Sequence, residues 1–129
     1  MATQTDLHCG LTGHAELTVG EVDTALWAGS GDVNVLGTPR LIALCEEATT
    51  AAIAQVLAPQ WTTVAMRVRF DHLAAVAIGT TVRAEATLER MEGRRLVFIV
   101  SASDDAGLVG AGRVTRVAVE RDRFLAKAR

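Results

Sequence analysis

The sequence lacks the features that mark several large classes of protein. No apolar run approaches the roughly 18 residues that a membrane-spanning helix needs. Residues 1–10 are polar and contain no apolar core of a signal peptide. The formal net charge is −2 and the basic residues form no cluster, so nucleic acid is not expected as a partner. These absences favour a cytoplasmic protein that binds neither membranes nor nucleic acid.

Cysteine and histidine are also scarce. The two cysteines, Cys9 and Cys45, are far apart, and we expect both to be free thiols in a reducing compartment. The 3 histidines have no clustered cysteines or carboxylates at ligand spacing, which gives no case for a metal. The sequence contains neither a glycine-rich phosphate loop nor a nucleophile elbow. We therefore expect no metal and no cofactor.

What the chain does contain is a large apolar fraction with a clear order of elements. Its 129 residues, 50% of them hydrophobic, suffice for a packed core and predict one domain over 1–129. A long amphipathic helix is predicted for about 39–57, with Thr38 as N-cap, Pro39 at the first helical position and Pro59 beyond its end.

Alternating polar and apolar residues predict strands over 14–19, 62–72, 81–91, 94–103 and 108–121. Short turns at 92–93 and 104–107 join the later strands as hairpins, so the sheet should be antiparallel. The basic tail, 122–129, is predicted as a short helical end. Because the apolar arc of the helix is too wide for one flat surface, the sheet should curl around it. The pattern predicts an α+β hotdog fold, an antiparallel sheet of about five or six strands wrapped around one central helix, whose open edges a second copy would cover.

One acidic residue stands out on this helix. On a helical wheel Glu46 falls inside the apolar arc, between Ile53 and Leu57, whereas Glu47 falls opposite, beside Arg40. A carboxylate without a partner in an apolar setting is costly, so Glu46 should have a partner or a task. Taken alone, it could simply pair with an arginine.

Three other residues are candidates of the same kind. His72 ends the apolar row formed by Val64, Met66, Val68 and Phe70, where a core histidine bonded to the backbone would also fit. Thr38 is explained by helix capping alone. Arg116 interrupts the strand around 114–119, as surface and bulge arginines do. No single residue among these is specific for a function.

Together these residues resemble a known pattern. In the fluoroacetyl-CoA thioesterase family of hotdog-fold acyl-CoA thioesterases, a threonine opens the central helix and a glutamate follows eight positions later. A histidine lies on the next strand, with a glycine seven positions beyond it. Here these positions hold Thr38, Glu46, His72 and Gly79. The resemblance covers nearly the whole chain and includes segments 92–96, 110–116 and 124–127.

The resemblance also assigns two residues to substrate binding, and the chain departs from the family pattern at two places. The substrate-contacting arginine of the family falls on Arg116, and a glycine seven residues before the histidine falls on Ala65, which adds a methyl group. The fluoroacetate-specific enzyme carries phenylalanines before the helix, whereas residues 32–36 here contain no aromatic side chain. The acyl group accepted by this chain could therefore differ.

The resemblance implies a hydrolase that converts a short or small acyl-CoA thioester to the free acid and coenzyme A, acting as a homodimer. Thr38, Glu46 and His72 would be catalytic. Glu46 would either attack the thioester carbonyl or activate a water molecule, and the sequence leaves both routes open. Two alternatives remain at this point, a non-catalytic acyl-CoA-binding module and a hotdog dehydratase.

Overall fold

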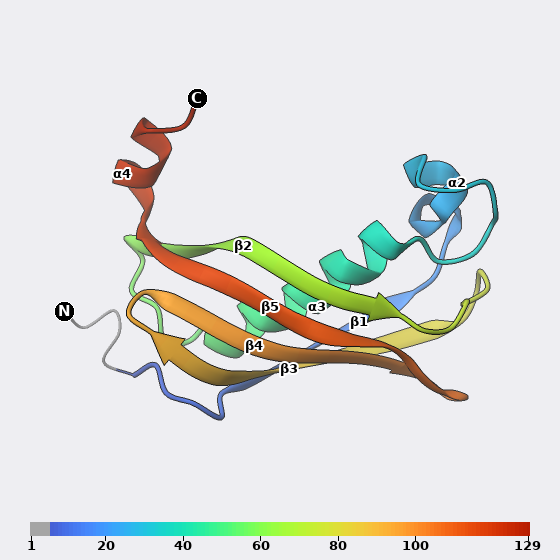
Figure 1. The fold of residues 1–129 in the computed structure, drawn as a ribbon, viewed down its shortest axis with the longest axis horizontal. Coiled ribbons are helices and arrows are strands. Elements are labelled where there is room, and N and C mark those ends of the chain that lie inside the picture. Colours follow the sequence, from blue (N-terminus) through green and yellow to red (C-terminus); the bar gives the residue numbers. More distant parts are fainter. Residues whose placement is uncertain (1–5) are drawn as a thin grey trace.

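Five antiparallel strands form one curled sheet, and a long helix, α3, runs across one of its faces (Figure 1). The computed structural model describes residues 6–129, so the first five residues of the polar stretch 1–10 lie outside the described part. The elements follow in the order β1 (Thr12–Thr18), the 3-10 turn η1 (Glu21–Asp23), α2 (Ala25–Ala28), α3 (Thr38–Ile53), β2 (Trp61–His72), β3 (Thr81–Glu92), β4 (Arg95–Asp104), β5 (Gly107–Glu120) and α4 (Arg121–Ala126).

The strand order in the sheet is β1-β3-β4-β5-β2, and every neighbouring pair is antiparallel. The hairpins at 92–93 and 104–107 therefore lie where the turn residues predict them. The predicted hotdog fold is confirmed, with a sheet of five strands. The strands β1 and β2 form its two edges.

The two ends of α3 differ from the prediction. The helix begins at Thr38 with Gly37 as its N-cap, and no side chain caps it, so the prediction of Thr38 as N-cap is wrong. It ends at Ile53 rather than at residue 57. The amide of Val56 donates to the Ile53 carbonyl at 3.1 Å, which closes the helix in a tight turn before Pro59 is reached.

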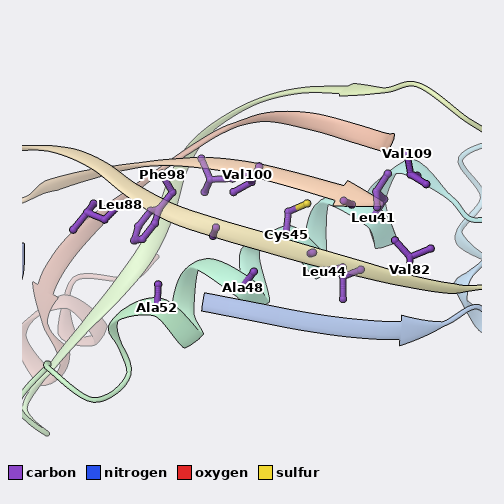
Figure 2. Packing of buried hydrophobic residues seen from close by; sticks show 14 of the residues in the cluster. Leu41, Leu44, Cys45, Ala48, Ala52, Val82, Leu88, Phe98, Val100 and Val109 are labelled. Carbon is purple, nitrogen blue, oxygen red and sulfur yellow. The ribbon is translucent and has the colours of Figure 1, made fainter. Parts of the chain in front are cut away.

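The core lies between α3 and the sheet (Figure 2). The side chains that α3 contributes include Leu41, Leu44, Cys45 and Ala48. They pack against strand residues that include Val82 and Leu88 of β3 and Phe98 and Val100 of β4. Cys45 is buried and Cys9 is exposed, and both thiols are free, as predicted. In the described part of the chain, no helix combines the length and the apolar character that crossing a membrane requires.

The segment between β1 and α3, which the sequence pattern leaves unassigned, is tied to the helix by Arg40. The Nε of Arg40 donates to the buried Asp23 at 3.1 Å, and its Nη1 donates to Glu47 at 3.0 Å. The helical wheel placed Glu47 beside Arg40, and this ion pair confirms that placement. This contact fixes η1 and α2 beside the start of α3, where the candidate site lies.

Candidate active site

The start of α3 and the end of β2 bring two of the candidate residues together. Thr38 is the first residue of α3 and His72 is the last residue of β2. Their side chains form a hydrogen bond of 2.7 Å between Oγ1 of Thr38 and Nδ1 of His72. The threonine hydroxyl is therefore engaged with the histidine and not with the backbone of its own helix.

The other ring nitrogen of His72 has no such partner. Nε2 is buried, and no hydrogen-bond partner for it lies among residues 6–129. Buried polar atoms are nearly always bonded, so an exception calls for an explanation, such as a ligand or a partner from outside the chain. Thr38 and His72 also line an open cavity of about 400 Å³, which is otherwise bordered largely by small and aliphatic residues such as Ala25, Val33, Val35 and Leu73.

The middle of α3 holds the second pair of candidate residues. Nη1 of Arg116 lies 3.4 Å from Oε1 of Glu46, and the Arg116 side chain is only 8% exposed, against 33% for Glu46. Glu46 thus lies at the margin of the buried helix face with an arginine as its partner. The alternative in which Glu46 simply pairs with an arginine is therefore what the structure shows, whereas the expectation of a surface position for Arg116 is wrong.

The Arg116 side chain is fixed by a residue that the sequence pattern did not single out. Its Nε donates to Oγ1 of Thr63 at 2.8 Å, and its Nη2 donates to the Thr63 carbonyl at 3.1 Å. Burial lowers the pKa of the Arg116 guanidinium, while the charge and the hydrogen bond of Glu46 act to raise it. With the two hydrogen bonds to Thr63 and the one to Glu46, each of the three guanidinium nitrogens of Arg116 has a partner.

A β-bulge explains why Thr63 was missed. The β2–β5 register shifts between Ala65 and Arg67, which leaves Met66 as an extra residue in β2. A bulge reverses the alternation of side chains along a strand. Thr63 is consequently buried, whereas Met66 is 41% exposed, so the predicted placement of Val64 and Met66 on the same face as His72 is wrong.

The two pairs lie apart in one chain. Eight residues separate Thr38 from Glu46 on the same helix, which corresponds to about 12 Å along its axis. Among the described residues, no hydrogen bond or ion pair joins Glu46 to Thr38 or His72. One chain therefore builds two partial sites, the pair Thr38–His72 and the pair Glu46–Arg116.

The remaining candidates lie close to these pairs. Ala65 is exposed and lies opposite Arg116 in the β2–β5 register, so it neighbours the Glu46–Arg116 pair. Gly79 has a φ of 96°, a conformation that favours glycine, and its amide donates to the Val19 carbonyl at 2.7 Å. Gly79 thus shapes the backbone of the loop between β2 and β3 and contributes no side chain to the site.

A curled antiparallel sheet with a central helix, and a threonine–histidine pair at the start of that helix, define a hotdog-fold thioesterase. The chain superposes with a TM-score of 0.88 on a mutant of the fluoroacetyl-CoA thioesterase solved in complex with acetyl-CoA, at 27% identity and over 94% of this chain and 96% of that one. It also superposes with a TM-score of 0.86 on a thioesterase superfamily member from Thermus thermophilus, at 27% identity and over 95% and 90% of the two chains.

The sequence narrows this class to one family. Residues 19–122 match the model of the fluoroacetyl-CoA-specific thioesterase family. The fluoroacetyl-CoA thioesterase of Streptantibioticus cattleyicolor is 35% identical over 95 residues, which cover 74% of this chain and 68% of the relative. The chain therefore belongs to the fluoroacetyl-CoA-specific thioesterase family and is a thioester hydrolase, which confirms the resemblance found in the sequence.

Proposed function

We propose that this protein hydrolyses small acyl-CoA thioesters to the free acid and coenzyme A, at sites that two identical chains build together. The observation that carries the proposal is the division of the candidate residues into two separated pairs. Thr38 and His72 meet at one end of α3, and the buried Nε2 of His72 has no hydrogen-bond partner among residues 6–129. Glu46 lies on the same helix about 12 Å from Thr38 along the axis, and it is paired there with Arg116.

The sheet edge supplies a way to join the two pairs. The strand β2 lies at the edge of the sheet, and an exposed edge tends to pair with another strand. Antiparallel pairing of two β2 strands about a two-fold axis would lay the two α3 helices side by side in opposite directions. The start of one helix would then approach the middle of the other. Each site would combine Thr38 and His72 of one chain with Glu46 of the second.

The chemistry of thioester hydrolysis suits this combination. A carbonyl held at the start of α3 lies at the positive end of the helix dipole, which stabilises the negative charge that develops on its oxygen during attack. The Thr38 hydroxyl adds a hydrogen bond. Glu46 either attacks the carbonyl to form an anhydride, which a water molecule then cleaves to the free acid, or takes a proton from a water molecule that attacks the carbonyl itself. His72 passes a proton to the departing thiolate of coenzyme A.

Arg116 has a supporting task in this scheme. Its guanidinium, anchored on both the hydroxyl and the carbonyl of Thr63, holds one carboxylate oxygen of Glu46 at 3.4 Å. Among residues 6–129 no hydrogen bond engages the second oxygen of Glu46, which would take part in the reaction.

The cavity beside Thr38 and His72 suits a small aliphatic acyl group. Its lining contains short aliphatic side chains, notably Val33, Val35 and Leu73, and no Phe, Tyr or Trp among the described residues. We therefore expect acetyl-CoA and propionyl-CoA to be hydrolysed faster than aromatic acyl-CoAs. Release of the free thiol from a panel of these thioesters measures the preference.

The decisive variant is Glu46→Gln, with Glu47→Gln as its matched control. Glu46→Gln keeps the shape of the side chain and removes its basicity, so the rate of acetyl-CoA hydrolysis should fall by at least about 100-fold. Glu47 pairs with Arg40 at 3.0 Å on the outer side of α3, and its amide variant should stay within about twofold of the wild type. A Glu46→Gln protein that is folded and turns over near the wild-type rate would refute the assignment.

A further inference from the structure

Three neighbouring cavities lead from Glu46 toward the end of β5. The first, of about 260 Å³, is lined by Glu46, Arg116 and Thr50. The second, of about 320 Å³, shares Thr50 with the first and extends past Leu57 to Trp61. The third, of about 230 Å³, shares Trp61 with the second and lies where α4 leaves the sheet. Each cavity shares a lining residue with the next, so the three lie in a row, which we call the groove.

The far end of this groove is both aromatic and cationic. Trp61 and Phe124 line it, although the whole chain has only 2 Trp, 3 Phe and no Tyr. Arg94, Arg123 and Lys127 line it as well, in a chain whose net charge is −2. The single carboxylate among the lining residues belongs to Glu120, which accepts a hydrogen bond of 2.7 Å from the Arg123 amide and caps α4.

Two of these side chains already form a cation–π pair, which we call the platform. The Arg94 guanidinium lies over the Trp61 ring, 5.1 Å from its centroid. Indole rings and arginine planes stack on nucleobases, and arginine and lysine bind phosphate groups through charge-assisted hydrogen bonds. The combination therefore matches a nucleotide that carries several phosphates.

We propose that this cavity binds the phosphorylated adenosine end of coenzyme A, and that the groove between it and Glu46 holds the pantetheine arm. The inference rests on the proposed function, in which a coenzyme A thioester is the substrate. Trp61 lies opposite Glu120 and Ala65 lies opposite Arg116 in the β2–β5 register. The four-residue offset places the platform roughly 13 Å from Arg116 along the strands. Coenzyme A carries its nucleotide at the far end of a long arm from the thioester, which fits such a separation.

The middle cavity has the character that the arm requires. Ile53, Ala54 and Leu57 provide apolar surface, and Thr50 and Thr62 add hydroxyl groups. A pantetheine arm alternates short apolar segments with two amides, so it can lie along the aliphatic side chains and bond to the hydroxyls.

A binding experiment tests the nucleotide site without requiring turnover. The chain has 2 Trp, so Trp27→Phe leaves Trp61 as the only indole reporter. Titration of that protein with adenosine 3′,5′-bisphosphate should change the Trp61 fluorescence saturably. Adding Arg123→Gln and Lys127→Gln should weaken the binding at least about tenfold, because both charged partners of the phosphates are lost. Arg83→Gln, an exposed arginine at the opposite end of β3, is the matched control and should leave the binding unchanged.

A kinetic experiment connects the site to the reaction. The variant with Arg123→Gln and Lys127→Gln should raise the KM for acetyl-CoA about tenfold and leave the hydrolysis of acetyl-N-acetylcysteamine, which has no nucleotide, at the wild-type rate. Equal losses with both substrates, or no loss with acetyl-CoA, would overturn the proposal. Binding of ATP without binding of coenzyme A would also overturn it. If Trp61 reports binding of coenzyme A while the wild type hydrolyses neither thioester, the nucleotide site stands and the proposed function fails.

Discussion

The carboxylate of Glu46 is oriented by a chain of contacts that reaches from α3 to the bulge in β2. Thr63 fixes Arg116 through two hydrogen bonds, and Arg116 in turn meets Glu46. A buried guanidinium is tolerated because its charge is paired and its donors are satisfied. The bulge at Met66 is what turns Thr63 toward this pair. A feature of the backbone therefore decides the position of a carboxylate that is distant in sequence.

Cys45, the residue before Glu46, should make the stability of the protein depend on alkaline pH. Burial, and then the charge of Glu46, raise the pKa of its thiol from 9.0 to about 12. Because the folded state holds this proton more tightly than the unfolded state, the stabilisation is complete below about pH 9 and is lost as the pH rises toward 12. Cys45→Ala should therefore flatten the fall of the unfolding free energy between pH 9 and 11, by up to about 1.4 kcal/mol per pH unit.

Urea denaturation at a series of pH values measures this effect, with Cys9→Ala, at an exposed position, as the control. The comparison rests on slopes, because Cys45→Ala also removes buried volume and lowers stability at every pH. An unchanged slope in Cys45→Ala would contradict the prediction.

Sequence spacing identified the residues of the candidate site better than it identified their contacts. Thr38, Glu46, His72 and Arg116 were all singled out, and the structure places them in two pairs. The helical wheel considers only the angular position of each residue, so it placed Glu46 inside the apolar arc. The true edge of the buried face depends on which side chains of the sheet pack against the helix, and at Glu46 that side chain is Arg116. Thr63 carried no signal, since the reversal of β2 at Met66 depends on pairing with β5.

At the scale of elements, the position of α3 is set by its close approach to β1. Gly13 lies in β1 directly against the backbone of Ala48 and Ala52, so a Cβ atom at Gly13 would overlap that backbone. Ala48 and Ala52 are themselves buried in the core between α3 and the sheet (Figure 2). This contact holds the second half of α3 close to β1.

Gly13→Ala should consequently destabilise the fold. The added methyl group cannot fit without moving β1 away from α3, and such overpacking costs about 1–3 kcal/mol of unfolding free energy. Gly20→Ala is the matched control, because a Cβ atom there would meet only the Asp23 carboxylate at 3.5 Å, an ordinary contact. Urea denaturation of both variants measures the difference. Equal midpoints for the two would show that β1 can shift freely.

The predictability of the elements follows from their length. The five strands were predicted within about two residues, because 7 to 14 residues of alternation give a clear period. The 3-residue η1 and the 4-residue α2 are too short to show a repeating pattern, and the segment is held by contacts such as that between Asp23 and Arg40. The end of α3 was overestimated because residues 54–57 continue the apolar pattern after the helix has closed.

At the scale of the whole molecule, the two partial sites and the open edge of β2 point to the same arrangement. A two-fold pair of chains would contain two equal sites, each made from the Thr38–His72 pair of one chain and the Glu46–Arg116 pair of the other. The sequence contains all four residues but gives no measure of the distance between the pairs. That distance arises from the rise of α3, which separates residues 38 and 46 by about 12 Å.

This arrangement predicts that two inactive variants restore one another when they share a dimer. Glu46→Gln spoils one half of the composite site and His72→Ala spoils the other, so each homodimer should be inactive. A mixed dimer contains one site with intact His72 and intact Glu46, and a second site that carries both substitutions. Chains with two different affinity tags, co-expressed and purified through both tags, should therefore hydrolyse acetyl-CoA at about half the wild-type rate.

A matched pair of variants separates true restoration from a general effect of mixing. Thr38→Val and His72→Ala fall in the same half of the site, where the two side chains are joined at 2.7 Å. Their mixed dimer has no intact site and should remain inactive. If each site lay within a single chain, neither mixture would recover. Persistent inactivity of the doubly purified Glu46→Gln and His72→Ala dimer would thus rule out a site shared between chains. It would not decide whether each chain hydrolyses the thioester on its own, which the Glu46→Gln variant tests separately.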